Sequence, residues 1–323
     1  MKQQRVSLFV LAIITTFLSC SKSDEDMSVF VGNITFLTQK QVDDFGETNY
    51  TSIQGNVEIG PLDTPTNEIT NLNGLLRLKS IQGSLYIGKN ESLTDTEGLK
   101  NLSSIGGFFH LRGNKHLTNL NGLSALTSIS NSLYLEENPA LISIDELKNL
   151  SFIGGKIRIY NNKRLSNING LINVSSIRDD ITIYGNDALV NIDGLKKIVL
   201  VEGSLKIDHN KSLTNLNGLS ILISISNDLT LSENIALRNI DGLSNLSKVG
   251  GAVEIWNNDA LINLDGLNNL SSVQLFSIKL NDKLTNFCGI NSLFTDVNPG
   301  THKVQGNAYN PNYQNFVDGN CSK

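Results

Sequence analysis

Residues 102–125 read LSSIGGFFHLRGNKHLTNLNGLSA, and this stretch decides the fold because it recurs every 24 residues. Units without insertion or deletion begin at Leu78, Leu102, Leu126, Leu150, Val174, Ile198, Leu222 and Leu246. A ninth unit, from Leu270, is one residue shorter, and an earlier unit, residues 50–77, is four residues longer. A fixed period of this length indicates a solenoid of about ten coils. We therefore expect one elongated domain, although a chain of 323 residues ordinarily holds two.

Each unit combines a strand with turns. Its eighth and tenth positions, Phe109 and Leu111 in the quoted stretch, are apolar and alternate with polar residues, which predicts a strand with one buried face. The other apolar residues recur at every third position, a spacing too tightly interrupted for a long amphipathic helix. A glycine preceded by Asn, Asp or Glu marks a turn in most units. Glu146 replaces that glycine once, so we expect its turn to form without the easy positive φ of glycine.

The thirteenth position of the units predicts a buried ladder of amides. It is occupied by Asn90, Asn114, Asn138, Asn162, Asn186, Asn210, Asn234, Asn258 and Asn281. A side-chain amide donates and accepts hydrogen bonds at once, so a stacked column of them can satisfy the backbone groups of a buried bend.

The pattern stops at both ends, which predicts caps over the repeat region 50–290. Residues 30–49 are the expected N-terminal cap and residues 291–323 the expected C-terminal cap. Cys288 and Cys321 are expected to form a disulfide that closes the last coil, since such bonds persist in exported proteins. A zinc site is the weaker alternative, because no histidine or further cysteine lies nearby in the sequence.

The N-terminus predicts export. Lys2 and Arg5 precede an apolar run from Val6 to Leu18, which is too short to span a bilayer as a helix. The run ends in Phe17-Leu18-Ser19-Cys20, which resembles a bacterial lipoprotein box. That resemblance implies a signal peptide over residues 1–19 and a lipid on Cys20. The following stretch, Ser21-Lys22-Ser23-Asp24-Glu25-Asp26, resembles the tethers that send some Gram-negative lipoproteins to the outer face of the outer membrane, so we expect a surface-exposed outer-membrane protein, with one that faces the periplasm as the alternative. The alternative to a lipoprotein is a soluble secreted protein.

The segment after Cys20 is polar and acidic, so we expect residues 20–29 to be a flexible tether. No later segment is apolar for long enough to cross a membrane, and contact with the membrane is expected through the lipid alone. Removal of residues 1–19 leaves 24 basic residues against 31 acidic ones. This balance disfavours nucleic acid as a partner, because such binding requires basic patches that neutralise phosphates.

The string Ile81-x-Gly83-x-Leu85-x-Ile87-x-x-Asn90-x-x-Leu93 and its copies resemble the receptor L domain. The resemblance covers about residues 50–290 and implies an all-β fold, a right-handed parallel β-helix. A leucine-rich-repeat horseshoe is the alternative, and the third-residue spacing after the asparagine argues against the helices of that fold.

The strand residues between the buried positions form the candidate ligand-binding face. Its members are Tyr86, His110, Arg112, Tyr134, Glu136, Arg158, Tyr160, Tyr184 and Trp256. Four of the seven tyrosines and the single tryptophan of the chain belong to this set. Exposed rings interleaved with charges suit recognition of a protein or polysaccharide at the cell surface. The competing interpretations are rings that only stabilise the sheet, and a rod that serves as a spacer or scaffold without a specific ligand.

We expect neither an enzyme nor a bound cofactor or metal. His110, Arg112 and Glu136 contain an acid/base candidate, but an open sheet offers no pocket to orient a substrate. Asp193, Asp241 and Asp265 occupy turn positions that alternate with asparagine, which is the pattern of Asx turns formed without metal.

Overall fold

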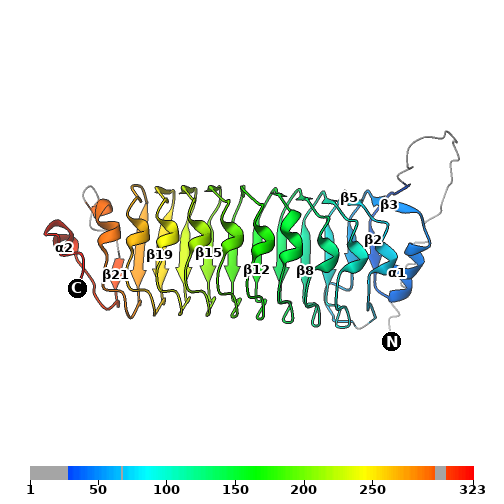
Figure 1. Cartoon of the computed structure of the whole chain (residues 1–323), viewed down its shortest axis with the longest axis horizontal. Coiled ribbons are helices and arrows are strands. Elements are labelled where there is room, and N and C mark those ends of the chain that lie inside the picture. The colour runs from blue at the N-terminus through cyan, green and yellow to red at the C-terminus, as the bar shows by residue number, and fades with distance from the viewer. Residues whose placement is uncertain (1–27, 67, 295–302) are drawn as a thin grey trace, which may run out of the picture.

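The computed structural model describes residues 28–66, 68–294 and 303–323. Cys20, the predicted signal peptide and most of the predicted tether lie outside these residues. Within them the chain winds into a straight rod of stacked coils, with the N-terminal segment at one end and the C-terminal segment at the other (Figure 1). The two termini of the rod are therefore far apart.

One long sheet of twelve strands runs the length of the rod, and all its neighbouring strands are parallel. In spatial order the strands are β2 (Ile34–Phe36), β4 (Val57–Ile59), β6 (Leu85–Gly88), β8 (Phe109–Arg112), β10 (Leu133–Glu136), β12 (Ile157–Tyr160), β13 (Ile181–Tyr184), β15 (Leu205–Asp208), β17 (Leu229–Ser232), β19 (Ala252–Trp256), β20 (Leu275–Lys279) and β21 (Lys303–Gln305). Each coil adds one strand in register, so residues 24 apart face each other from β6 to β19.

A second wall consists of short strands in two sheets. The first sheet holds β1 (Ser28–Phe30), β3 (Tyr50–Ile53), β5 (Ser80–Ile81), β7 (Ser104–Ile105), β9 (Ser128–Ile129) and β11 (Phe152–Ile153). The second holds β14 (Leu200–Val201), β16 (Ser224–Ile225) and β18 (Lys248–Val249). In the intervening coil only a single bridge forms, between Ile177 and Val201.

A 3-10 turn closes the third side of each coil. These turns are η1 (Asn73–Leu75), η2 (Glu97–Leu99), η3 (Asn121–Leu123), η4 (Asp145–Asn149), η5 (Asn169–Leu171), η6 (Asp193–Leu195), η7 (Asn217–Leu219), η8 (Asp241–Leu243), η9 (Asp265–Leu267) and η10 (Cys288–Phe294). The apolar positions of every coil point inward and form one continuous core; in the quoted stretch Leu102, Ile105, Phe109 and Leu111 are fully buried. The predicted all-β parallel solenoid is confirmed.

The asparagines of the thirteenth position lie in the core and bond to one another. Asn162 donates its Nδ2 to the carbonyl of Leu135 at 2.8 Å, and its Oδ1 accepts from the backbone N–H of Asn138 at 3.1 Å. The same pattern repeats along the rod from Asn90 to Asn281. Asn307, which the sequence pattern did not identify, extends the ladder by accepting from the N–H of Asn281 at 3.0 Å.

The repeated glycines have a different role from the one expected. Gly170 and Gly218 do not have positive φ; instead, a Cβ at either would meet a carbonyl oxygen of the previous coil at 1.8 and 2.0 Å. The glycine is needed because stacked turns touch, so the expectation based on φ was wrong. At Glu146 the 3-10 turn is five residues long instead of three.

Positive φ belongs to another column, the twelfth position of the units. Its non-glycine members are Lys89, Glu137, Asn161, His209, Glu233, Asn257 and Leu280, with φ between 53° and 58°. The bend after each strand of the long sheet therefore requires the left-handed conformation, whatever residue occupies it.

At both ends of the rod, segments predicted to lie outside the repeat region contribute strands to the sheets. β1 and β2 pair with β3 and β4, so residues 28–29 of the predicted tether and part of the predicted N-terminal cap belong to a coil. The helix α1 (Gln39–Gly46) then covers the core with Val42 and Phe45. At the other end β21 extends the long sheet beyond residue 290, and α2 (Tyr313–Val317) packs Phe316 against Phe294.

Cys288 and Cys321 form a disulfide, with their Cα atoms 5.0 Å apart. Among the described residues, no helix is both long and apolar enough to cross a membrane.

Candidate functional site

The candidate ligand-binding residues lie on the outer face of the long sheet in two rows. The register places Tyr86, His110, Tyr134 and Arg158 side by side in one row. Arg112, Glu136, Tyr160 and Tyr184 form the other. Parallel strands in strict register bring residues 24 apart into contact, and this explains why scattered positions of the sequence become neighbours.

Four rings form what we call the N-terminal aromatic cluster: Tyr86, Phe108, His110 and Tyr134. His110 lies in its centre, with its ring centroid 5.3 Å from Tyr86 and 5.4 Å from Tyr134. Phe108 packs edge-on against Tyr134 at 6.2 Å. Sequence reasoning missed Phe108, although Ser occupies the same position in several neighbouring units and the exception is visible there.

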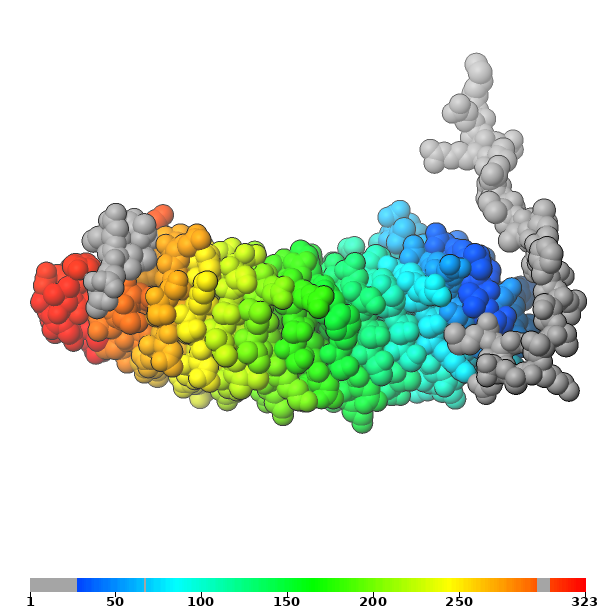
Figure 2. Space-filling view, turned by 90° about the horizontal axis from the view of Figure 1, so that it is seen from above, coloured from blue at the N-terminus to red at the C-terminus, as the bar shows by residue number. Residues whose placement is uncertain are grey.

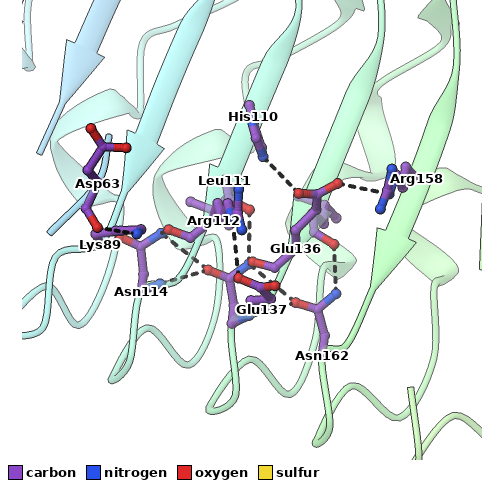
Figure 3. Close-up of polar contacts among 12 residues, drawn as sticks. Asp63, Lys89, His110, Leu111, Arg112, Asn114, Glu136, Glu137, Arg158 and Asn162 are labelled. Carbon is purple, nitrogen blue, oxygen red and sulfur yellow. Dashed lines mark hydrogen bonds and ion pairs between the residues drawn. The ribbon is translucent and has the colours of Figure 1, made fainter. Parts of the chain in front are cut away.

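The carboxylate of Glu136 ties the cluster to the next coil. Its Oε2 lies 3.2 Å from Nε2 of His110, and its Oε1 accepts from Nε of Arg158 at 2.9 Å. Figure 3 shows these two side chains approaching Glu136 from the strands on either side. The hydrogen bond to His110 lowers the pKa of the Glu136 carboxyl below its ordinary value, and the charge of Arg158 adds to this effect.

Arg112 is the register partner of Glu136, but its hydrogen bond goes to a different carboxylate. Its Nε donates to Oε2 of Glu137 at 3.1 Å, and this hydrogen bond raises the pKa of the guanidinium. Glu137 is the next residue along the chain from Glu136 and has a φ of 55°. The rotamer, which no sequence pattern encodes, decides the pairing.

A hollow of about 410 Å³ opens beside the cluster. Tyr86, Phe108, His110 and Arg112 line it on the sheet. The four-residue insertion of unit 50–77, around Pro61 to Pro65, forms a loop that contributes Leu62 and Asp63. Nζ of Lys89 donates to the carbonyl oxygen of Asp63, which holds the loop against the sheet (Figure 3). The insertion noted in the sequence thus forms one wall of the hollow. Glu58 also lines it, and burial raises the pKa of its carboxyl.

Tyr86 is less available than the strand pattern predicted. It is 8% exposed, and its phenol ring occupies the space in which a side chain at Gly88 would lie. Burial raises the pKa of its hydroxyl. Tyr86 therefore forms the floor of the hollow, whereas Phe108, at 36% exposed, forms its rim.

A second group of rings lies farther along the face. Tyr160 and Tyr184 stack with centroids 4.8 Å apart and planes at 11°, and His209 packs on Tyr184 at 4.6 Å. Arg158 lies over Tyr160, 4.8 Å from its centroid. The faces of these rings pack against one another, as the alternative interpretation of cross-strand stabilisation predicts.

Trp256 is remote from both groups, between Ser232 and Lys279 in the register. The predicted single face is thus divided into a cluster with a hollow, a self-stacked group and one separate ring. Among residues 28–66, 68–294 and 303–323, no three His, Cys, Asp or Glu side chains are placed to hold a metal ion together.

Residues 49–146 match the family model described as the receptor L domain. The matched segment begins just before β3 and ends in η4, so it contains the N-terminal aromatic cluster and the hollow but not the second ring group. At a general level the match indicates a ligand-binding surface protein. No curated protein matches the chain.

Proposed function

We propose that this chain is a lipid-anchored cell-surface protein that recognises a protein or glycan through the hollow beside the N-terminal aromatic cluster. The single observation that carries the proposal is the position of this hollow inside the segment that matches the receptor L domain.

The chemistry of the hollow favours recognition. Aromatic faces supply contact area at little cost in side-chain entropy, and the ion pair between Glu136 and Arg158 fixes charges beside them. The inserted loop converts an otherwise open sheet into a concave site, which is the shape that binds ligands selectively.

The repeat itself provides variants that remove the cluster without disturbing the coils. Phe108→Ser, His110→Thr and Tyr134→Thr introduce residues that other units carry at the same positions, such as Ser132, Thr182 and Thr230. We expect the triple variant to weaken binding at least about tenfold on a glycan array and against a panel of extracellular proteins, because hot-spot rings carry most of the binding energy.

The matched control removes the second ring group by Tyr160→Ser and Tyr184→Ser. Serine is chosen because Ser232 occupies the same position in a later unit. Binding should survive this change. If the control variant loses binding and the cluster variant keeps it, the site assignment is wrong; if neither the wild type nor any variant binds, the spacer function is favoured.

The anchor is a separate part of the proposal and rests on the lipoprotein-like box that ends at Cys20. Cys20→Ser should transfer the protein from the membrane fraction to the soluble fraction, with Cys288 and Cys321 unchanged. Unaltered fractionation would refute the lipid. Protease treatment of intact cells then distinguishes a surface-exposed protein from one that faces the periplasm.

A further inference from the structure

One edge of the rod is basic and free of acidic residues. It consists of the last two and first three residues of consecutive units, which connect each 3-10 turn to the following short strand. We call it the basic edge and define it by nine segments, residues 76–80, 100–104, 124–128, 148–152, 172–176, 196–200, 220–224, 244–248 and 268–272.

The charge of this edge is opposite to that of the chain. About one residue in ten of the protein is Asp or Glu and the net charge is −5, yet none of the nine segments contains an acid. Seven basic side chains lie on the edge and all are exposed: Arg77, Lys79, Lys100, Lys148, Lys196, Lys197 and Lys248.

Backbone hydrogen bonds align the segments in two runs, from 76–80 to 148–152 and from 196–200 to 268–272, on either side of the break in the short sheet. The N–H of Thr127 donates to the carbonyl of Ser103 at 2.9 Å, and the N–H of Ile223 donates to that of Val199 at the same distance. With strands about 4.8 Å apart, the edge is about 40 Å long. Figure 2 views the rod from the side on which Figure 1 draws β3 and β5, where the short strands begin, and shows an elongated surface without a protruding domain along its middle.

Polar ladders normally cover the edge. The hydroxyl of Ser103 donates to the carbonyl of Lys79 at 2.9 Å, and Nδ2 of Asn101 donates to the carbonyl of Leu76 at 2.7 Å. Equivalent hydroxyl bonds join Thr127, Ser151, Ser247 and Ser271 to the preceding coils. Equivalent amide bonds come from Asn149, Asn173, Asn245 and Asn269.

Basic residues or Ala125 interrupt the ladders at some coils, but large aliphatic residues do so only in two neighbouring coils. Val199 and Ile223 replace the hydroxyl residues, and Ile221 replaces the asparagine. These side chains are 41%, 50% and 42% exposed, and the adjacent Leu200 is 37% exposed. The exchange loses hydrogen bonds and leaves apolar surface in water, so folding does not explain it.

Lys196 and Lys197 lie directly before this aliphatic patch. Nζ of Lys197 donates to the neutral amide oxygen of Asn173 at 2.7 Å, an interaction that leaves its charge uncompensated. Of the two acidic residues nearest in the sequence, Asp193 belongs to the 3-10 turn η6, and Glu202 lies exposed just after β14, two residues beyond Leu200. Positive charge and exposed aliphatic side chains thus coincide at one site of the edge.

We propose that the basic edge docks on an anionic lipid surface. The lysine and arginine side chains would lie at the level of the lipid phosphates, and Val199, Leu200, Ile221 and Ile223 would insert among the headgroups. Basic residues beside apolar ones are typical of binding at a membrane interface. The basic residues are attracted to anionic headgroups, and the apolar residues are removed from water. This contact is additional to the proposed lipid anchor and uses a different face from the proposed ligand site.

The test uses residues 20–323 with Cys20→Ser, so that no acyl chain contributes, and vesicles with roughly one-third phosphatidylglycerol in phosphatidylcholine. We expect cosedimentation with these vesicles but not with pure phosphatidylcholine, and a loss of binding between about 0.1 M and 0.5 M salt. Lys148→Glu, Lys196→Glu and Lys197→Glu together should weaken partitioning at least about tenfold.

Two further variants isolate the components. Val199→Ser, Ile221→Asn and Ile223→Ser restore the polar ladders, so the fold should be retained while binding weakens several-fold. Lys115→Glu, Lys206→Glu and Lys283→Glu reverse the same number of charges away from the edge and should weaken binding less than the edge reversal does.

The proposal is overturned if the protein binds both vesicle types equally. It is likewise overturned if the charge reversal on the edge and the control reversal weaken vesicle binding equally. It is also overturned if the chain binds a soluble polyanion such as alginate but no vesicle. A melting curve for each variant establishes that the coils remain folded.

Discussion

At the scale of single residues, Glu136 connects the proposed site to the stability of the rod. Its side chain is 12% exposed and pairs with both His110 and Arg158. Its pKa is lowered below the ordinary value of 4.5, so folding favours the ionised form. The resulting stabilisation is complete above pH 4.5 and is lost as the pH falls through the lowered pKa of the folded state.

We therefore expect Glu136→Gln to destabilise the protein by about 1 kcal/mol at pH 7, and this difference to shrink at about pH 3. Urea unfolding at both pH values measures it. Glu137→Gln is the control, because the pair between Glu137 and Arg112 is more exposed and should contribute less. A difference that grows on acidification would contradict the sign of the pKa shift.

The left-handed bends provide a second residue-scale prediction. Leu280 has a φ of 55° and is 52% exposed. The left-handed conformation strains its backbone, and burial of the side chain offsets little of that strain. Leu280→Asn should stabilise the protein by about 0.5–1 kcal/mol, since asparagine tolerates the left-handed region and already occupies this column at Asn161 and Asn257. An unchanged or lower melting temperature would show that Leu280 contributes more by packing than it costs by strain.

At the scale of structural elements, the asparagine ladder is the device that converts a sequence period into a stack. Asn162 lies in its middle. Its amide satisfies two backbone groups of the preceding coil, the carbonyl of Leu135 and the N–H of Asn138, and donates to the side chain of Asn186 in the following coil. Asn90 lies at its N-terminal end, and its Oδ1 has no hydrogen-bond partner.

Position in the ladder should therefore determine the cost of a substitution. We expect Asn162→Ala to lower the free energy of unfolding by about 3 kcal/mol and Asn90→Ala by about 1 kcal/mol, because fewer buried groups lose partners at the end. Chemical denaturation of both variants provides the comparison. Equal costs would indicate that the amides act independently.

At the scale of the whole molecule, the rod exposes its core only at its ends, and each end is covered differently. The N-terminal cover is α1, whereas the C-terminal cover depends on the Cys288–Cys321 bond across a sequence separation of 33 residues. In a solenoid each coil contacts mainly its neighbours, so loosening of one end spreads inward from that end.

Cys288→Ser with Cys321→Ser should thus cost about 3 kcal/mol through the regained entropy of the unfolded loop. Hydrogen exchange should increase first around Asn281 and Asn307, and later or not at all around Asn90. Uniformly increased exchange would instead indicate that the rod unfolds as one unit.

The sequence predicted the features that repeat. The period of Leu102, Phe109 and Asn114 is the period of the stack, so a local pattern determined the strands, the buried faces and the ladder. A repeated pattern does not predict its exceptions. These are the break in the short sheet at Ile177, the ladder member Asn307 in a segment without the repeat, and the ring of Phe108.

The glycines show where the limit lies. Their recurrence at Gly170 and Gly218 is visible in the sequence, but the reason for it is contact with the coil below, which exists only in the folded rod. The same holds for Tyr86, which is buried over Gly88, and for Arg112, which pairs with Glu137.

The sequence by itself thus determined the solenoid, because inward and outward positions follow from backbone periodicity. Only the tertiary structure decided which outward side chains meet in the hollow and which align in the basic edge. Those neighbours come from different coils, and their contacts depend on rotamers and on an inserted loop that no period describes.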